Sequence, residues 1–168
     1  MTTYEVRPAV PEDAVRLGEV HTQVWREAYA GLMRAEYLAG LDPALAVARF
    51  AERLAAPEPG RVLLVGTADG RVVGMASAGP SRDEPPDPPA QVYAVNVLAA
   101  HHGTGLGARL LEAAIDAVAG DGAVSLWVAE GNARARAFYR RFGFVPDGQT
   151  SWLPDAEVDL VRLVRPAR

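Results

Sequence analysis

A glycine-rich turn between a predicted strand and a predicted helix is the feature that most constrains how this chain can fold. Gly103, Gly105 and Gly107 alternate along the turn, which follows a β-rich run at 91–98. Apolar residues at helical spacing mark the helix that follows: Leu106, Leu110, Leu111, Ala114, Ile115 and Val118. Glycines allow several backbone N–H groups to point at one place, and the first turn of a helix adds a partial positive charge. The sequence therefore predicts a phosphate-binding cradle at this turn.

The residues before this turn divide into a mainly helical part and a β-hairpin. A breaker cluster of alanine, proline, glutamate and glycine at 55–60 separates the two parts. The Asp69-Gly70 step between two β-rich runs is typical of hairpin turns. The pattern predicts a strand at 4–7, helices at 11–29, 34–41 and 43–54, and strands at 61–67 and 71–78.

The segment 79–90 contains five prolines and three acidic residues. Since proline cannot donate to a strand ladder, this segment is expected to be an exposed loop. Beyond the glycine-rich turn, the pattern predicts a strand at 123–128, a helix at 132–142 and a final strand at 157–164. The order of elements predicts one α+β (mixed α/β) domain that spans residues 1–168.

The composition excludes several classes of function. The chain has 168 residues, and its 17 basic residues are all arginine, against 21 acidic residues and no cysteine. Without cysteine there is no disulfide scaffold, thiolate metal site or cysteine nucleophile. A net charge of −4 argues against a nucleic-acid partner. No signal peptide or membrane-spanning run is apparent, so a cytoplasmic location without a membrane partner is expected.

Three interpretations of the glycine-rich turn remain open. It can be a tight strand–helix turn without a ligand. It can also be a dinucleotide site, because Gly103-x-Gly105-x-x-Ala108 fits the pattern G-x-G-x-x-A. The preceding hairpin is not the βαβ context that this second interpretation requires, and the expected ribose-binding acid is displaced to Glu130. The third interpretation is a pyrophosphate site for an acyl-CoA.

The third interpretation gains from a resemblance to the GCN5-related N-acetyltransferase (GNAT) superfamily. Residues 102–107, His-Gly-Thr-Gly-Leu-Gly, are similar to the family's Gln/Arg-x-x-Gly-x-Gly/Ala turn, with His102 in place of the usual glutamine or arginine. Residues 136–144, Arg-Ala-Phe-Tyr-Arg-Arg-Phe-Gly-Phe, resemble a second family motif further along the chain. Two motifs in the family's order are more specific than either motif alone.

The resemblance implies a central, mostly antiparallel sheet of six or seven strands, splayed between the fourth and fifth strands and flanked by helices. It also implies direct transfer of an acetyl group from acetyl-CoA, as co-substrate, to an amine, without a metal. The cofactor-binding residues that it implies are Val95, Val97, His102, Gly103, Thr104, Gly105, Leu106, Gly107, Ala108 and Asn132. Arg109, just inside the glycine-rich turn, and Arg134 are the arginines expected to meet a cofactor phosphate with a planar, permanently charged group. Asn132 is equally suited to cap the helix that it precedes.

Other residues are expected to act on the transferred group or on the acceptor. Tyr139 matches the family's tyrosine acid, which protonates the departing thiolate, although a half-buried structural tyrosine is the alternative. Four residues are expected on the acceptor side: Trp25, Tyr29, Glu84 and Tyr93. For Trp25 and Tyr29, a packing role is the alternative.

The general base and the acceptor are left open by the sequence. Gln91 occupies a position where relatives often carry glutamate, and an amide does not titrate. Glu84, Asp87, Glu27 and a water relay through Tyr93 are the candidate bases. The acceptor is expected to be a small amine or a protein N-terminus, and the protein a monomer or homodimer. Two alternative functions stay open. The protein can be an acyltransferase that uses another acyl-CoA as donor, or a CoA-binding regulatory module without efficient catalysis.

Overall fold

A seven-stranded sheet with a single parallel junction organises the chain. In the computed structural model, which describes residues 1–168, the strand order is β1-β2-β3-β4-β5-β7-β6. The strands are β1 (Tyr4–Pro8), β2 (Val62–Ala68), β3 (Arg71–Pro80), β4 (Ala90–Val97), β5 (Val124–Ala129), β6 (Val145–Leu153) and β7 (Val158–Arg165). Only β4 and β5 run parallel, and every other neighbouring pair is antiparallel.

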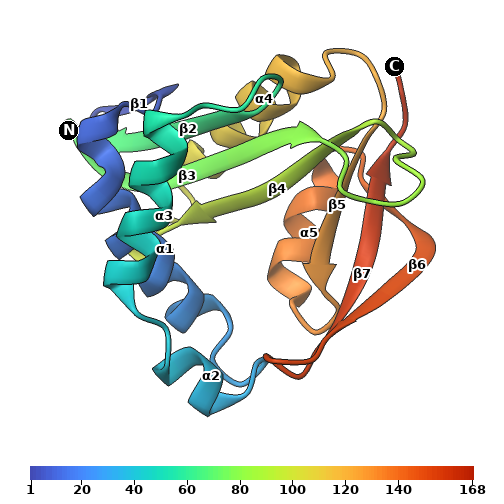
Figure 1. Cartoon of the computed structure of the whole chain (residues 1–168). Helices are drawn as coiled ribbons and strands as arrows, with labels where there is room; N and C mark the ends of the chain where they lie inside the picture. The colour runs from blue at the N-terminus through green and yellow to red at the C-terminus, as the bar shows by residue number, and fades with distance from the viewer.

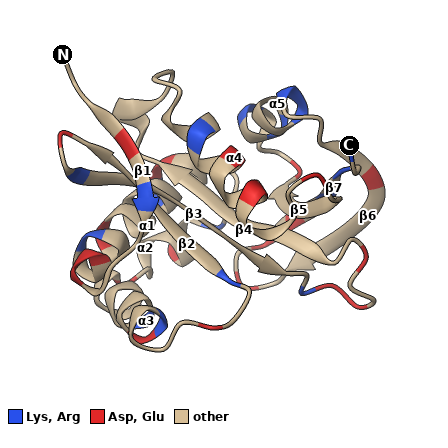
Figure 2. Ribbon diagram, turned by 90° about the horizontal axis from the view of Figure 1, so that it is seen from above, with Lys and Arg blue, Asp and Glu red and all other residues tan.

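Helices cover both faces of the sheet. They are η1 (Pro11–Asp13), α1 (Ala14–Ala28), α2 (Ala35–Ala39), α3 (Pro43–Ala55), η2 (Ala99–His101), α4 (Leu106–Val118) and α5 (Ala133–Arg141). Helices α1 and α3 lie on one face of the β1–β4 half, and α4 and α5 lie on the opposite face (Figures 1 and 2). None of the helices is long and apolar enough to cross a lipid bilayer.

The two halves of the sheet diverge at the parallel junction. Strands β4 and β5 pair only at Ala90–Val124 and at Gln91–Ser125. A β-bulge lies next to this point, because Ser77 and Ala78 of β3 pair with Ala94 and Val92 and leave Tyr93 without a partner. A bulge bends its strand and increases the local twist, which turns the rest of β4 away from β5. Figure 1 shows the two strands moving apart below their paired ends.

Two apolar clusters hold these layers together. The larger one lies between the β1–β5 strands and helices α1, α3 and α4, and it also includes Tyr139 and Phe144 of the α5 region. A smaller cluster joins α2 and the end of β5 to the β6–β7 turn: Met33, Leu38, Ala129, Ala156 and Val158. The backbone N–H of Arg34 also donates to the carbonyl of Ala156 at 3.0 Å. The two diverging halves are therefore tied together again at the end far from the parallel junction (Figure 1).

The expected mostly antiparallel sheet, splayed between the fourth and fifth strands, is confirmed. The expected helices and the Asp69-Gly70 hairpin are also found, with the first helix entered through the short η1 turn. The sequence analysis missed β6, which it left between a helix and the final strand. Eight of the nine residues of β6 are exposed, so the alternation of apolar and polar residues that marks a half-buried strand is absent. Pro146 and Gly148 also lie where the pairing with β7 is irregular.

A buried carboxylate fixes the start of α1. Asp13 accepts hydrogen bonds from both terminal nitrogens of Arg7 on β1, at 2.7 and 2.9 Å, and from the backbone N–H of Val10 at 2.9 Å. The hydrogen bond with Arg7 is the main reason that the pKa of Asp13 lies below its ordinary value, although burial opposes the shift. A lowered folded-state pKa stabilises the fold above the ordinary carboxyl pKa, and this contribution is lost as the pH falls through the folded value.

We expect Asp13→Asn to lower the free energy of unfolding at pH 7 by about 1.5–3 kcal/mol, the usual contribution of hydrogen bonds to a charged group. Urea unfolding at pH 7 and at pH 3 measures this, and the gap between wild type and variant should shrink at pH 3. Glu12→Gln, at an exposed neighbouring acid, is the matched control and should change little. A gap of the same size at both pH values would contradict the role of the Asp13 charge.

Candidate functional site

The glycine-rich turn presents a group of backbone amides without partners. The N–H groups of Gly103, Thr104, Gly105, Gly107 and Ala108 donate to no acceptor of the protein, whereas that of Arg109 donates to the Gly105 carbonyl. Residues 102–105 are exposed, so solvent and ligands can reach these amides. Together with the positive end of the α4 dipole, they form an arrangement that binds anions.

The turn depends on glycine at two positions. Gly103 and Gly105 have φ angles of +77° and +85°, in the left-handed region that other residues rarely adopt, and a Cβ at either position would meet only open space. The Thr104 hydroxyl donates to the carbonyl of His101 at 2.8 Å and closes the loop. The turn is therefore held in shape by its own backbone and leaves room above it.

The His102 side chain turns toward the end of β4. Its Nε2 lies 2.9 Å from the carbonyl oxygen of Val97. This contact fixes the step from β4 into the turn, which is a local role that the sequence analysis did not foresee for this residue. The other nitrogen of the imidazole has no partner in the protein.

Strand β4 forms one wall beside the turn. Val95 and Val97 lie on the α4 side of the sheet, since they pair with Ala76 and Gly74, and Gly74 packs against Leu110 of α4. Beyond Gln91, no residue of β4 pairs with β5. The backbone groups of β4 that point toward β5 therefore have no strand partner beside Val95 and Val97, and an extended ligand with amide groups can pair with them.

Helix α5 forms the other wall. Asn132 caps it, because its side-chain oxygen accepts from the backbone N–H of Ala135 at 3.1 Å. Tyr139 lies in the middle of the helix and is 9% exposed, with its ring against Phe138 and Phe144. Burial raises the pKa of Tyr139, and the nearby Tyr29 raises it further, so the phenol keeps its proton at neutral pH. The Tyr139 hydroxyl makes no hydrogen bond within the protein and is therefore free to donate to a ligand.

The two arginines expected at the cofactor differ in their surroundings. Arg109 is exposed, and its Nη1 donates to the carbonyl of Tyr4 on β1 at 2.7 Å. Arg134, in the first turn of α5, is exposed and makes no hydrogen bond or ion pair. Figure 2 shows arginine on the exposed part of α5, on the same side of the sheet as α4. Arg134 is thus the more available of the two for an anionic ligand.

The residues expected at the acceptor lie on the opposite face or along its edge. Trp25 stacks on His21 with ring centroids 5.3 Å apart and contacts Tyr29 at 5.0 Å, which makes an aromatic row along α1. Tyr93, the bulged residue of β4, lies on the α3 side and donates its hydroxyl proton to the Pro80 carbonyl at 2.6 Å. Burial raises the pKa of Tyr29, and Tyr29 in turn adds to the raised pKa of Tyr139.

A network centred on Asp83 fixes the proline-rich loop to the far half of the sheet. Asp83 accepts from Trp127 Nε1 of β5 at 2.8 Å and from Arg162 Nη1 of β7 at 3.0 Å. Arg162 also donates through Nε to Asp147 of β6 at 2.7 Å. Burial is the largest single influence on the pKa of Asp147 and raises it, but the hydrogen bond and charge of Arg162 and the backbone N–H of Gln149 together bring the pKa below its ordinary value. The exposed loop expected at 79–90 is shorter, because β3 extends to Pro80 and β4 begins at Ala90, and it is exposed along most of its length but anchored.

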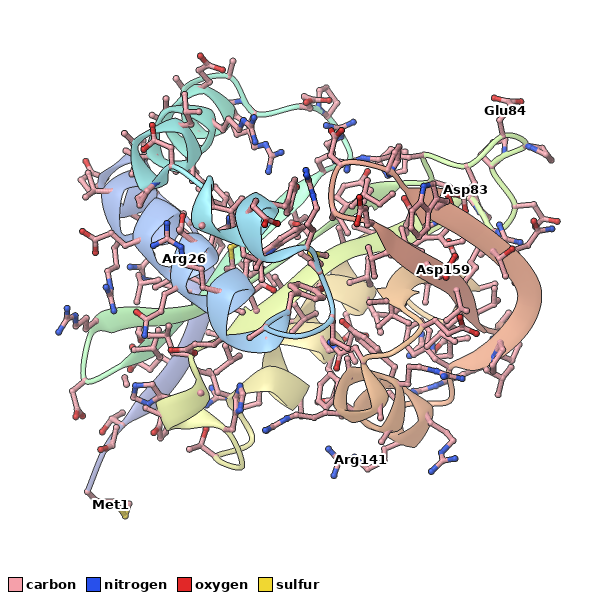
Figure 3. All side chains as sticks on the ribbon, turned by 90° about the horizontal axis from the view of Figure 1, so that it is seen from below. Met1, Arg26, Asp83, Glu84, Arg141 and Asp159 are labelled. Atoms are coloured by element: carbon pink, nitrogen blue, oxygen red, sulfur yellow. The ribbon has the colours of Figure 1, made fainter.

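The loop also lines a cavity of about 370 Å³ with residues of β5, β6 and β7. Glu84 is one of the lining residues, and its carboxylate reaches outward at the edge of the loop, whereas Asp83 lies against the strands (Figure 3). The sequence analysis named Glu84 as a candidate but did not name Asp83, Trp127 or Arg162. No local pattern marks them, because the partners of Asp83 are 44 and 79 residues away along the chain.

The candidate bases are not gathered in one place. Glu27 is exposed and accepts from the backbone N–H of Ala99 at 3.2 Å and from Gln23 at 2.8 Å. The Gln91 amide donates to Asp83 at 3.4 Å and accepts from the backbone N–H of Arg82 at 3.2 Å. At the position where relatives often carry glutamate, this residue therefore anchors the loop. Asp87 and Glu84 lie along the cavity.

Known proteins resemble this chain in sequence and in fold. The sequence model of the acetyltransferase (GNAT) family matches residues 23–144. An uncharacterized N-acetyltransferase of Mycobacterium bovis is 33% identical over 141 residues, which cover 81% of this chain and 85% of that protein. An uncharacterized N-acetyltransferase of Mycobacterium tuberculosis matches with the same identity and coverage.

Two solved structures share the fold. PaiA N-acetyltransferase from Thermoplasma acidophilum, in complex with coenzyme A, has a TM-score of 0.72 at 17% identity over 99% of each chain. YncA from Salmonella typhimurium, with acetyl-CoA, has a TM-score of 0.70 at 23% identity over 96% of this chain and 92% of that one. Because the family model covers most of the chain and a relative is 33% identical over 81% of it, the chain belongs to the GNAT family of N-acetyltransferases.

Proposed function

We propose that this protein, as one catalytic domain of residues 1–168, transfers the acetyl group of acetyl-CoA directly to an amine. The observation that carries the proposal is the group of unpartnered amides at 103–108, directly beside the strand that has lost its neighbour. An anion and an extended amide chain are the two parts of coenzyme A that such a site can hold. The complexes of PaiA with coenzyme A and of YncA with acetyl-CoA support this assignment.

The residues of this chain divide the binding task. The amides of Gly103, Thr104, Gly105, Gly107 and Ala108 donate to the pyrophosphate, and Arg134 adds a mobile positive charge. The backbone of β4 at Val95 and Val97 pairs with the amides of the pantetheine arm, as an added strand would. The backbone amides of the same strand are suited to stabilise the oxyanion that forms at the thioester carbonyl.

Acetyl-CoA supplies a thioester whose C–S bond breaks as the amine nitrogen forms a bond to the carbonyl carbon. Tyr139 then donates its phenolic proton to the departing sulfur, and the proton that the nitrogen loses as it becomes an amide passes through water and restores the phenol. Two features support this role: the ring is nearly excluded from water, and the hydroxyl has no competing partner in the protein. The raised pKa of the phenol opposes proton donation, so a close contact with the developing thiolate must drive the transfer. The acceptor approaches from the opposite side of the sheet, where Trp25, Tyr29 and Tyr93 lie, as a small amine or a protein N-terminus.

The charge of the cradle is tested by Thr104→Glu with Thr104→Gln as its matched control. Both variants lose the hydroxyl contact to His101, and only the glutamate adds a negative charge. We expect the glutamate variant to raise the Kd for acetyl-CoA about tenfold above that of the glutamine variant, because a carboxylate repels the pyrophosphate. Calorimetry at low and high salt should show a smaller difference at high salt. Equal Kd values at low salt would place the pyrophosphate elsewhere.

Tyr139→Phe tests the proton donor. Since the hydroxyl bonds to no protein group, the variant should fold normally and bind acetyl-CoA with nearly unchanged Kd. Its kcat should fall roughly 100-fold, the usual size of a general-acid contribution. Tyr37→Phe, on α2, serves as the control and should keep wild-type turnover. A Tyr139→Phe enzyme with wild-type kcat would remove this residue from the chemistry. If the wild-type protein binds acetyl-CoA but releases no CoA with any amine tested, it is instead a regulatory module.

A further inference from the structure

Four arginines lie on the acceptor side of the sheet, two of them against the Tyr93 ring and two on helix α3. They are Arg49 and Arg53 of α3, Arg61 at the start of β2, and Arg82 of the proline-rich loop, and we call them the arginine cluster. The Arg82 guanidinium lies 3.7 Å from the centre of the Tyr93 ring, and that of Arg61 lies 5.6 Å from it. The Tyr93 ring therefore brings together arginines from two separate segments of the chain.

Helix α3 contributes the other two arginines. Arg53 lies over the buried ring of Phe50 at 5.7 Å, and Phe50 contacts His21 of α1 at 5.9 Å. Burial, followed by the charges of Arg82, Arg61 and Arg49, lowers the pKa of Arg53, whereas the charge of Glu58 acts in the other direction. Burial and the charges of Arg53 and Arg49 also lower the pKa of His21, so its ring stays neutral near them.

The arginine cluster has little compensating negative charge. Glu58 forms an ion pair with Arg61 at 2.6 Å. Arg49 and Arg53 make no ion pair or hydrogen bond, and the Arg82 side chain makes only its contact with Tyr93. Asp83, the acid next to Arg82, is already paired with Arg162. In a chain with a net charge of −4, such a gathering of uncompensated guanidinium groups is suited to an anionic ligand.

The position of the cluster excludes the phosphates of coenzyme A as that ligand. The pyrophosphate cradle lies on the α4 side of the sheet, whereas Arg61, Tyr93 and the Gly79 backbone beneath Tyr93 lie on the α3 side. Tyr93 precedes Val95 by two residues, which is about 7 Å along a strand. An anion held by the cluster near Tyr93 therefore lies about 7 Å, a distance that one small molecule can span, from the strand segment proposed to hold the thioester.

We propose that the arginine cluster binds an anionic group, a carboxylate or a phosphate, on the same small molecule that carries the acceptor amine. This proposal rests on the proposed acetyl transfer and narrows its acceptor to amines with a negatively charged group a few bonds from the nitrogen. The Tyr93 ring holds Arg82 and Arg61 in place, and the arginines of α3 contribute positive charge to the same anion.

The experiment compares matched acceptors that differ in the anionic group: β-alanine with propylamine, and phosphoethanolamine with ethanolamine. CoA release gives kcat/KM for each acceptor, and calorimetry on the CoA-bound protein gives its Kd without turnover. The two pairs separate carboxylate from phosphate recognition. Wild type should favour the anionic member of at least one pair by about tenfold or more, and added salt should reduce this ratio.

The variants are Arg53→Gln, Arg82→Gln and the double variant, with Arg71→Gln in the β2–β3 hairpin as an exposed control. The double variant should bring the ratio close to one, whereas Arg71→Gln should keep it, and the Kd for acetyl-CoA should stay unchanged in all of them. A ratio near one in wild type, or a ratio that survives in the double variant, would overturn this proposal. If no acceptor is acetylated, the ratio of the calorimetric Kd values of the matched acceptors decides the proposal. A wild-type protein that does not bind acetyl-CoA would instead refute the proposed function.

Discussion

The divergence of β4 from β5 is the constraint on which the rest of the site depends. Two parallel strands that paired along their whole length would satisfy each other's backbone groups and leave nothing for a ligand. Here the pairing stops at Gln91 and Ser125, next to the bulge at Tyr93. The exposed strand edge, the unpartnered amides of the glycine-rich turn and the buried Tyr139 then meet on one side of the sheet. The aromatic row of α1 and the arginine cluster lie on the other.

Contacts at both ends hold the two diverging halves of the sheet together. At the paired end, Asp83 joins the β3–β4 loop to Trp127 of β5 and Arg162 of β7. At the far end, Arg34 bonds to Ala156 of the β6–β7 turn, and the small apolar cluster packs beside it. A carboxylate with several donors and an apolar cluster are both costly to disrupt. The strands can therefore stay apart in the middle without the sheet separating into two pieces.

Much of this arrangement could be predicted from the sequence, because its signals are local. The glycine-rich turn, the helix periodicities, the Asp69-Gly70 hairpin and the cap at Asn132 each involve residues close along the chain. The missed features depend on distant partners or lack a pattern. Exposed β6 shows no alternation, and Asp83 and Arg109 find partners that only the fold brings near. The proline-rich loop was expected to be exposed, which holds for most of residues 81–89, yet composition says nothing of its anchor.

Amide hydrogen exchange with and without coenzyme A tests the central claim most directly, because it reports on the backbone groups that the divergence leaves unpaired. We predict that coenzyme A slows exchange at residues 103–108 and along β4 beyond Gln91. Exchange in β1 and β2, at the opposite edge of the sheet, should stay unchanged. Slowed exchange confined to other segments, with saturating coenzyme A bound, would contradict the claim that the cofactor occupies the space between the diverging strands.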